Sequence, residues 1–272
     1  MKRYIEYAAL AAICIMALGT TTECRAWNRM GHESAVLLAQ ARLTPGVRSR
    51  VDAILGSSMK SNAGWLDDFG SNKEVGGYTR KWHDLHLDAE LVPVAANDND
   101  ALVQIERAAD VLRHRADHPD SLVAASLRTL LCLVPEMHSI PHVRIANIPL
   151  SKKKFNVQLS NGFTGKKAAI TKTTWEKFWD KVVIFNQHGA FSPEMYAADM
   201  EICYGADAAA FAAGTPRDWA SEMGRECAVL YKWAAEDYML SREFRNRQEP
   251  IAYKCLARSG YRLAALLNEC LK

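Results

Sequence analysis

The sequence lacks a hydrophobic run long enough to cross a membrane. Its signal-like apolar stretch, residues 8–18, covers about eleven residues, whereas a transmembrane helix needs roughly 20. The sequence also lacks a glycine-rich phosphate-binding loop, an internal repeat with a period of 20–50 residues, and any low-complexity tract. These absences argue against a membrane-spanning protein, against the nucleotide-binding folds that use a glycine-rich phosphate loop, and against a solenoid. We therefore expect one soluble globular domain without stable membrane association.

Neither sign of charge dominates the chain. It has 34 Lys+Arg and 31 Asp+Glu, and 31 and 29 of these remain when residues 1–26 are left out. Such a balance argues against a protein that holds nucleic acid chiefly through massed phosphate contacts, although a local groove can still be basic.

Residues 1–26 have the features of a signal peptide. Lys2 and Arg3 give a positive start, an apolar run follows, and residues 24–26 provide a small-residue cleavage site. We expect cleavage to leave Trp27 as the mature N-terminus and the protein to be exported to the periplasm or the cell exterior.

Five of the seven cysteines remain after that cleavage, in a compartment that permits disulfides. Cys132 stands apart and is expected to be unpaired. The other four could form two bridges in any of three connectivities: Cys203, Cys227, Cys255 and Cys270.

The apolar periodicity of the mature chain is mainly helical. Residues 56–77 predict a long loop carrying Asp67 and Asp68, and residues 148–174, with Asn161-Gly162, predict a small β-hairpin or protruding loop. The pattern predicts an all-α fold with one helical domain over residues 27–272 and this small insertion. The helices are expected over residues 31–43, 47–55, 101–118, from an N-cap at Asp120 to 133, 175–185, 216–240, and 250–272.

Residues able to bind a metal recur in distinctive local contexts. Trp27 is followed five residues later by His32, and the segments Trp65-Leu66-Asp67, Trp82-His83-Asp84, Cys132-x3-Glu136-x5-His142 and Trp175-Glu176-x3-Asp180 follow in order. These contexts resemble the S1/P1 family of single-strand nucleases and its zinc-dependent phospholipase C relatives. The resemblance covers nearly the whole mature chain and includes its last helix.

The resemblance implies an all-helical domain with up to three zinc ions at the base of a cleft. It implies hydrolysis of single-stranded DNA or RNA by metal-activated water, with Asp67 nearest that water as ligand and proton acceptor. A free terminal amine would also bind metal, which makes processing a requirement of the site. The implied ligands are Trp27, His32, Asp67, His83, Cys132, Glu136, His142, Glu176 and Asp180.

Several positions depart from the family's pattern. Cys132 and Glu176 replace histidine and Glu136 replaces aspartate, each by a residue type that still binds zinc. Pro135 removes a backbone N–H and disfavours helix at Val134. We therefore expect the Glu136 side chain to point in a different direction from the family's ligand at this position. Lysines 152–154 stand near the place of the family's Gly-Gly-Asn stretch and could attract phosphate.

Three alternatives stay open at this point. Cys132 is equally well explained as a small buried apolar side chain. The changes at 132, 135, 136 and 176 also fit a secreted pseudoenzyme or binding protein of the same fold. The third alternative is a lipid phosphodiesterase of the phospholipase C kind. The sequence leaves the oligomeric state undetermined.

Overall fold

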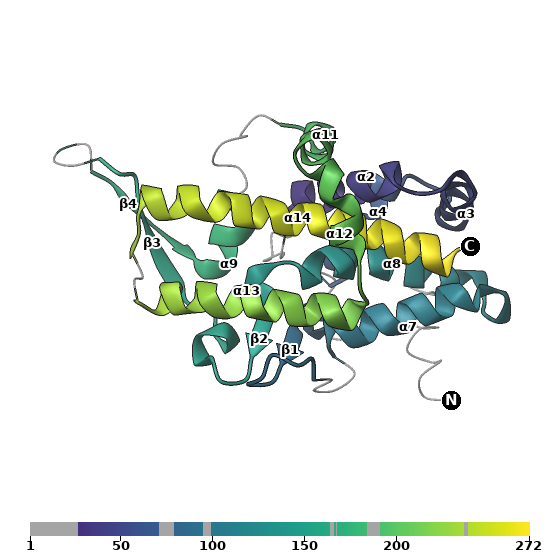
Figure 1. The fold of residues 1–272 in the computed structure, drawn as a ribbon, viewed down its shortest axis with the longest axis horizontal. Helices are drawn as coiled ribbons and strands as arrows, with labels where there is room; N and C mark the ends of the chain where they lie inside the picture. Colours follow the sequence, from purple (N-terminus) through teal and green to yellow (C-terminus); the bar gives the residue numbers. More distant parts are fainter. Residues whose placement is uncertain are drawn as a thin grey trace.

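The computed structural model describes residues 27–70, 79–94, 99–163, 166, 168–183, 191–236 and 239–272. These residues form a mostly helical domain with two small sheets (Figure 1). The prediction of a single helical domain with a small β insertion is confirmed. In the part of the chain that the structure describes, no helix is both long and apolar enough to cross a membrane. The expected signal peptide, residues 1–26, lies outside it.

Polar side chains cap the starts of five of the longer helices, α2 (Arg29–Ala41), α3 (Pro45–Leu55), α7 (Ala101–Arg113), α11 (Pro193–Tyr204) and α14 (Arg242–Cys270). Asn28, Thr44, Asp100, Ser192 and Ser241 each accept a hydrogen bond from a backbone N–H of the first turn, which satisfies a donor that has no partner within the helix. The other longer helices are α8 (Asp120–Met137) and α13 (Pro216–Glu236). The shorter ones are α4 (Met59–Asn62), α5 (Trp65–Gly70), α9 (Trp175–Lys177) and α12 (Ala208–Ala212).

Helix α14 runs along the length of the molecule and packs on α2, α7, α8, α11 and α12 (Figure 1). Its approach to α2 is close at Gly260, where an added Cβ would lie 2.9 Å from Leu38 Cδ2 and 3.0 Å from the Ala35 carbonyl oxygen. Helices α7 and α8 form the expected pair, and α8 is buried along most of its length. Helices α2 and α8 therefore present the side chains of their inner faces to one core.

A two-stranded parallel sheet joins two distant parts of the chain. Strand β1 (Leu85–Leu87) pairs with β2 (Val143–Ile145), with Leu85 opposite Val143. Two 3-10 turns precede these strands, η1 (Arg80–His83) and η3 (Ile140–His142). The register therefore places His83 and Asp84 beside His142.

The expected β-hairpin is present. Strand β3 (Asn156–Ser160) pairs antiparallel with β4 (Ile170–Thr174), and β5 (Met239–Leu240) adds to β3 in parallel. The hairpin projects from the end of the molecule at which α14 begins (Figure 1).

Several expected boundaries are wrong. The loop expected over residues 56–77 contains α4 and α5, because Ser58 caps a short turn through Ser61 N–H at 3.1 Å; residues 71–78 lie outside the description. Helix α14 starts at Arg242 and passes through Pro250, since Ser241 supplies its cap. Helix α13 ends at Glu236, because Met239 and Leu240 pair with β3. Asp120 is the first helical residue of α8, and Pro119 occupies the cap position.

The helix expected over residues 175–185 is divided. It consists of α9 and the π-helical turn η6 (Phe178–Val183), while Phe185 lies outside the described residues.

The prediction that Pro135 disturbs the helix around Glu136 is also wrong. Helix α8 continues to Met137, and Glu136 points into the candidate site described below. Pro135 lies in the last turn, where it removes a single intrahelical hydrogen bond. Its own carbonyl accepts a hydrogen bond of 2.9 Å from the Trp27 indole N–H.

The structure corrects the expected disulfides as well. All five cysteines downstream of Ala26 are described, and all are free thiols. Cys255 and Cys270 lie on the same helix about 22 Å apart, at 1.5 Å per residue, which is far beyond disulfide reach. Cys203 is exposed on α11, whereas Cys227 is buried on α13.

Candidate metal centre

Three buried side chains from separate helices converge. His32 of α2, Asp67 of α5 and Glu136 of α8 each offer a ligand atom, and these atoms lie within 4.8 Å of one another. His32 Nε2 lies 3.3 Å from Glu136 Oε1 and 3.8 Å from Asp67 Oδ2. We refer to these three residues as the triad.

His83, at the end of η1, adds a fourth donor on the other side of the carboxylates. Its Nδ1 lies 3.0 Å from Glu136 Oε1 and 3.9 Å from Asp67 Oδ1. Glu136 therefore stands between two imidazoles.

The local structure around Trp27 fixes the entry of α2. Asn28 accepts from Gly31 N–H at 3.0 Å and starts the helix, so that His32 faces inward. The Trp27 ring is fully buried against Gly31, where an added Cβ would lie 3.0 Å from the Trp27 Cβ. Its indole N–H then binds Pro135 in the turn that carries Glu136. One side chain thus links the helices that hold His32 and Glu136.

The electrostatics of the site couple acids and bases. Burial lowers the pKa of His32 and His83, but Glu136 and Asp67 outweigh burial, so the pKa of His32 is raised and that of His83 is raised to about 9. Burial raises the pKa of the Glu136 carboxyl. The neighbouring His83 and His32 outweigh burial and hold that pKa well below its usual range. The cluster favours ionised carboxylates.

The triad has nitrogen and oxygen atoms, able to bind a metal, that form no hydrogen bond within the described protein. Within the described residues, both ring nitrogens of His32 and Oε2 of Glu136 are buried without a hydrogen-bond partner. Such atoms are costly in a folded protein unless a ligand binds them. Imidazole and carboxylate are ordinary zinc donors, so these residues fit a zinc ion.

His142 lies beside the triad, as the register of β1 and β2 dictates. The centroids of its ring and the His83 ring are 6.4 Å apart. His142 Nδ1 lies 3.4 Å from Asp84 Oδ1, and Arg144 donates to the same oxygen at 2.8 Å. Asp84 and Arg144 were not among the predicted site residues, although Asp84 directly follows His83 in sequence.

Two further predicted residues come from the segment after the hairpin. Asp180 in η6 is almost completely buried; burial first, and then Glu136, Glu176 and Asp67, raise its pKa well above the usual range. Glu176 in α9 is also buried, but its Oε2 lies 3.4 Å from Lys154 Nζ.

Cys132 takes a different position from the other predicted ligands. Its Sγ donates to the Ala63 carbonyl at 3.2 Å and accepts from Leu66 N–H at 3.4 Å. Burial, followed by the Asp67 charge, raises the thiol pKa well above its usual range. The side chain fills a buried position that supports α5, which carries Asp67.

His138 is held apart from the centre. Its Nδ1 lies 2.7 Å from the Val134 carbonyl, and Arg262 donates to Nε2 at 2.8 Å. Both ring nitrogens are thus used within the protein.

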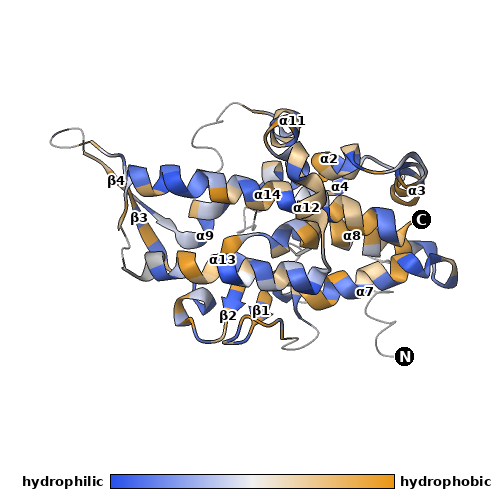
Figure 2. Cartoon of the chain, in the orientation of Figure 1, coloured by the Kyte–Doolittle hydropathy of each residue, from blue (hydrophilic) through white to orange (hydrophobic). Residues whose placement is uncertain are grey.

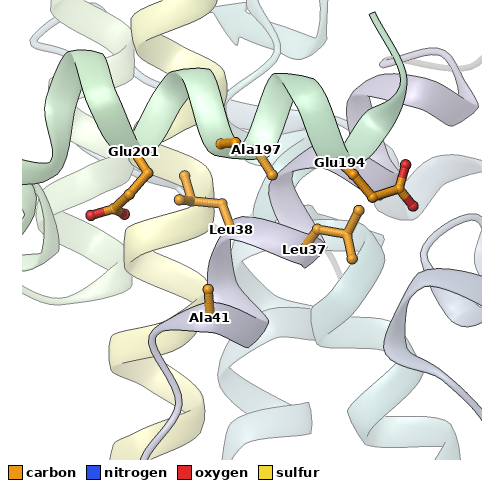
Figure 3. A pocket seen from close by; sticks show the side chains of 7 residues that line it. Leu37, Leu38, Ala41, Glu194, Ala197 and Glu201 are labelled. Atoms are coloured by element: carbon orange, nitrogen blue, oxygen red, sulfur yellow. The ribbon is translucent and has the colours of Figure 1, made fainter.

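One cavity lies away from these residues. It is a shallow apolar depression between α2 and α11, with Leu37, Leu38 and Ala41 on one side and Ala197 on the other (Figure 3). The carboxylates at its ends are paired, Glu194 with Lys60 and Glu201 with Arg42. It contains none of the predicted site residues.

Comparison with known proteins gives one family. The sequence model of the S1/P1 nuclease family matches residues 27–272. No curated protein matches the chain.

Proposed function

Because the chain belongs to the S1/P1 nuclease family, we propose that it uses bound zinc to hydrolyse phosphodiester bonds of single-stranded DNA or RNA. The observation that carries the proposal is the buried triad of His32, Asp67 and Glu136, with ligand atoms within 4.8 Å. Two carboxylates and an imidazole at that spacing suit a divalent cation. A divalent cation at this position could activate water for phosphodiester hydrolysis.

Up to three zinc ions are part of the proposal. His32, Asp67, Glu136 and His83 would hold the first, because their donor atoms already face one another. His142, Glu176, Asp180 and the freed amine of Trp27 are the further donors. Cys132 is left out, since its thiol is engaged with the backbone next to α5. When bound, zinc supplies Lewis acidity that activates water for attack on phosphorus.

The protein's own groups would complete the reaction. Asp67 would accept the proton from the attacking water, as the family resemblance implies; its carboxylate belongs to the triad. Glu136, flanked by His32 and His83, holds both imidazoles in place. Asp84 and Arg144 orient His142 in the same manner.

Export belongs to the same proposal. Removal of residues 1–26 would expose the amine of Trp27, a residue that already packs against the turn bearing Glu136. The family match beginning at residue 27 supports this boundary.

The first test is elemental analysis of zinc combined with a nuclease assay on exported, cleaved protein. We expect one to three zincs per molecule and chelator-sensitive cleavage of single-stranded DNA. His32→Ala and Asp67→Ala should each lower kcat/KM by about 100-fold or more, because each removes a proposed ligand. The matched control is His114→Ala, which removes an exposed histidine outside the centre and should leave the rate unchanged.

Two results would redirect the proposal. A protein without zinc that binds single-stranded DNA but never cleaves it would be a binding protein of the same fold. Hydrolysis of phosphatidylcholine without cleavage of DNA would identify a lipid phosphodiesterase.

A further inference from the structure

The lysines of this chain are unevenly distributed. Residues 149–175 contain six lysines and no Asp or Glu, so the rest of the mature chain carries 25 basic and 29 acidic side chains. This segment comprises the lysine cluster at 152–154 and the β3–β4 hairpin. We call its described residues between 152 and 174 the basic arm.

The positive charges of the basic arm face solvent. Lys153, Lys166 and Lys172 are exposed, and within the described chain none of the three forms an ion pair. Some exposed basic groups on the helices do pair with a carboxylate, as Arg113 does with Glu269. Unpaired lysines on one projection attract an anionic partner.

An aromatic ring accompanies these charges. Phe163, beyond the end of β3, has 57% of its surface exposed. Its neighbours along the hairpin are mostly polar, including Asn161, Thr171 and Thr173. An exposed ring among lysines and small polar side chains is the combination that binds unpaired bases, by stacking, and phosphates, by charge.

The basic arm is continuous with the candidate metal centre. Strand β4 leads directly into Glu176, and Lys154 Nζ lies 3.4 Å from the Glu176 carboxylate. A small cavity at this junction is lined by Arg144, Lys153, Lys154 and Trp175. Strand β3 alone extends about 17 Å, at roughly 3.3 Å per residue, so the arm offers an extended track that leads away from the centre.

Helix α14 supports the far part of the arm. Arg245 donates to the Ser160 carbonyl at 2.9 Å, and the Arg242 side chain packs beneath Gly162, whose φ is +77°. The start of α14 is hydrophilic where it meets the hairpin (Figure 2). The exposed Arg242 adds a further positive group there.

We propose that the basic arm binds the strand of a single-stranded nucleic acid outside the metal centre, with Lys166 and Lys172 on phosphates and Phe163 stacked on a base. The inference rests on the proposed nuclease function for the identity of the anion. A linear polyanion with unpaired bases matches both the extended track of charges and the exposed ring.

The test measures binding of a phosphorothioate oligothymidine to zinc-loaded mature protein by fluorescence anisotropy, over a range of salt concentrations. Lys166→Ala/Lys172→Ala should weaken binding about tenfold at low salt and make the slope of log K against log salt shallower by about 1.4, since each phosphate contact on a single strand contributes about 0.7. Phe163→Ala should weaken binding at least about fivefold without changing the slope. The control, Arg48→Ala/Lys272→Ala, removes two positive charges at the other end of the molecule and should bind as the unmodified protein does.

A small substrate separates this proposal from the proposed function. The p-nitrophenyl ester of thymidine monophosphate is too short to reach the arm, so the arm variants should hydrolyse it at the unmodified rate while their KM for long single strands rises. If the unmodified protein cleaves the ester and the arm variants bind oligothymidine normally, the arm proposal is wrong and the nuclease proposal stands. If the protein cleaves neither substrate, the nuclease proposal fails, and an arm-dependent salt slope still supports the arm. Arm-dependent binding to phosphatidylglycerol vesicles without binding to oligothymidine would overturn the arm proposal in favour of a lipid surface.

Discussion

The Cys132 thiol lies next to the candidate metal centre but is directed at the backbone. Sγ contacts the Ala63 carbonyl and Leu66 N–H, and these contacts hold the start of α5 against α8. A side chain used in this way contributes packing and a hydrogen bond to stability.

We therefore expect Cys132→Ala to retain the zinc content of the unmodified protein. Its free energy of unfolding should fall by about 1–2 kcal/mol, from the lost hydrogen bond and the small cavity. Elemental analysis and urea unfolding measure the two quantities. Loss of about one zinc per molecule would show instead that Cys132 is a ligand.

Some contacts of single residues could not be predicted from the sequence. Nothing in the chain order indicates that Trp27 donates to Pro135, 108 positions away, because the bond depends on how α2 and α8 pack. The pairing of His142 with Asp84 depends likewise on the register of β1 and β2. Residue type and spacing could identify the candidate donors, whereas their grouping required the tertiary structure.

At the scale of elements, the close approach of α2 and α14 at Gly260 is a point of sensitivity. Gly260→Ala should destabilise the protein by about 1–3 kcal/mol, because the new methyl group would overlap Leu38 and the Ala35 carbonyl. Since α2 also carries His32, zinc affinity should fall in the same variant. Thermal unfolding and zinc titration measure both effects.

The matched control for this substitution is Gly46→Ala. Gly46 lies in the first turn of α3, and the nearest atom to its added Cβ is a flexible Arg50 nitrogen at 3.9 Å. This variant should be as stable as the unmodified protein or slightly more stable. Equal behaviour of the two variants would contradict the close-packing explanation.

Elements with a strong apolar period could be predicted from sequence, and those set by long-range contacts could not. Helices α2, α3 and α7 start within two residues of the expected positions, because Asn28, Thr44 and Asp100 cap them locally. Strand β5 forms only because β3 lies beside it, and so residues 239–240 appeared to continue a helix. Pro135 appeared disruptive because its place in the last turn of α8 was not known.

At the scale of the whole molecule, the candidate metal centre brings together side chains of α2, α5 and α8, which lie far apart in the sequence. In the metal-free protein His83 of this centre takes up a proton readily. Burial lowers the pKa of His83, but the charges of Glu136 and Asp67 outweigh burial and raise the pKa to about 9. The ordinary pKa of histidine in an unfolded chain is about 6.5. A raised pKa in the folded state stabilises the fold fully below pH 6.5, and the stabilisation is lost as the pH rises through about 9.

We expect the free energy of unfolding of chelator-treated protein to fall between pH 6.5 and pH 9. Zinc should oppose this fall, because a deprotonated imidazole is the form that binds metal, and free zinc at 100 times its dissociation constant adds about 2.7 kcal/mol. Urea unfolding at a series of pH values, with and without zinc, measures both. His83→Gln should flatten the metal-free profile, whereas His114→Ala should leave it unchanged, since that histidine is exposed and remote from Glu136. A metal-free protein as stable at pH 9 as at pH 6.5, with a melting temperature that zinc does not alter, would mean that the clustered acids and histidines form neither a proton-linked nor a metal-linked centre.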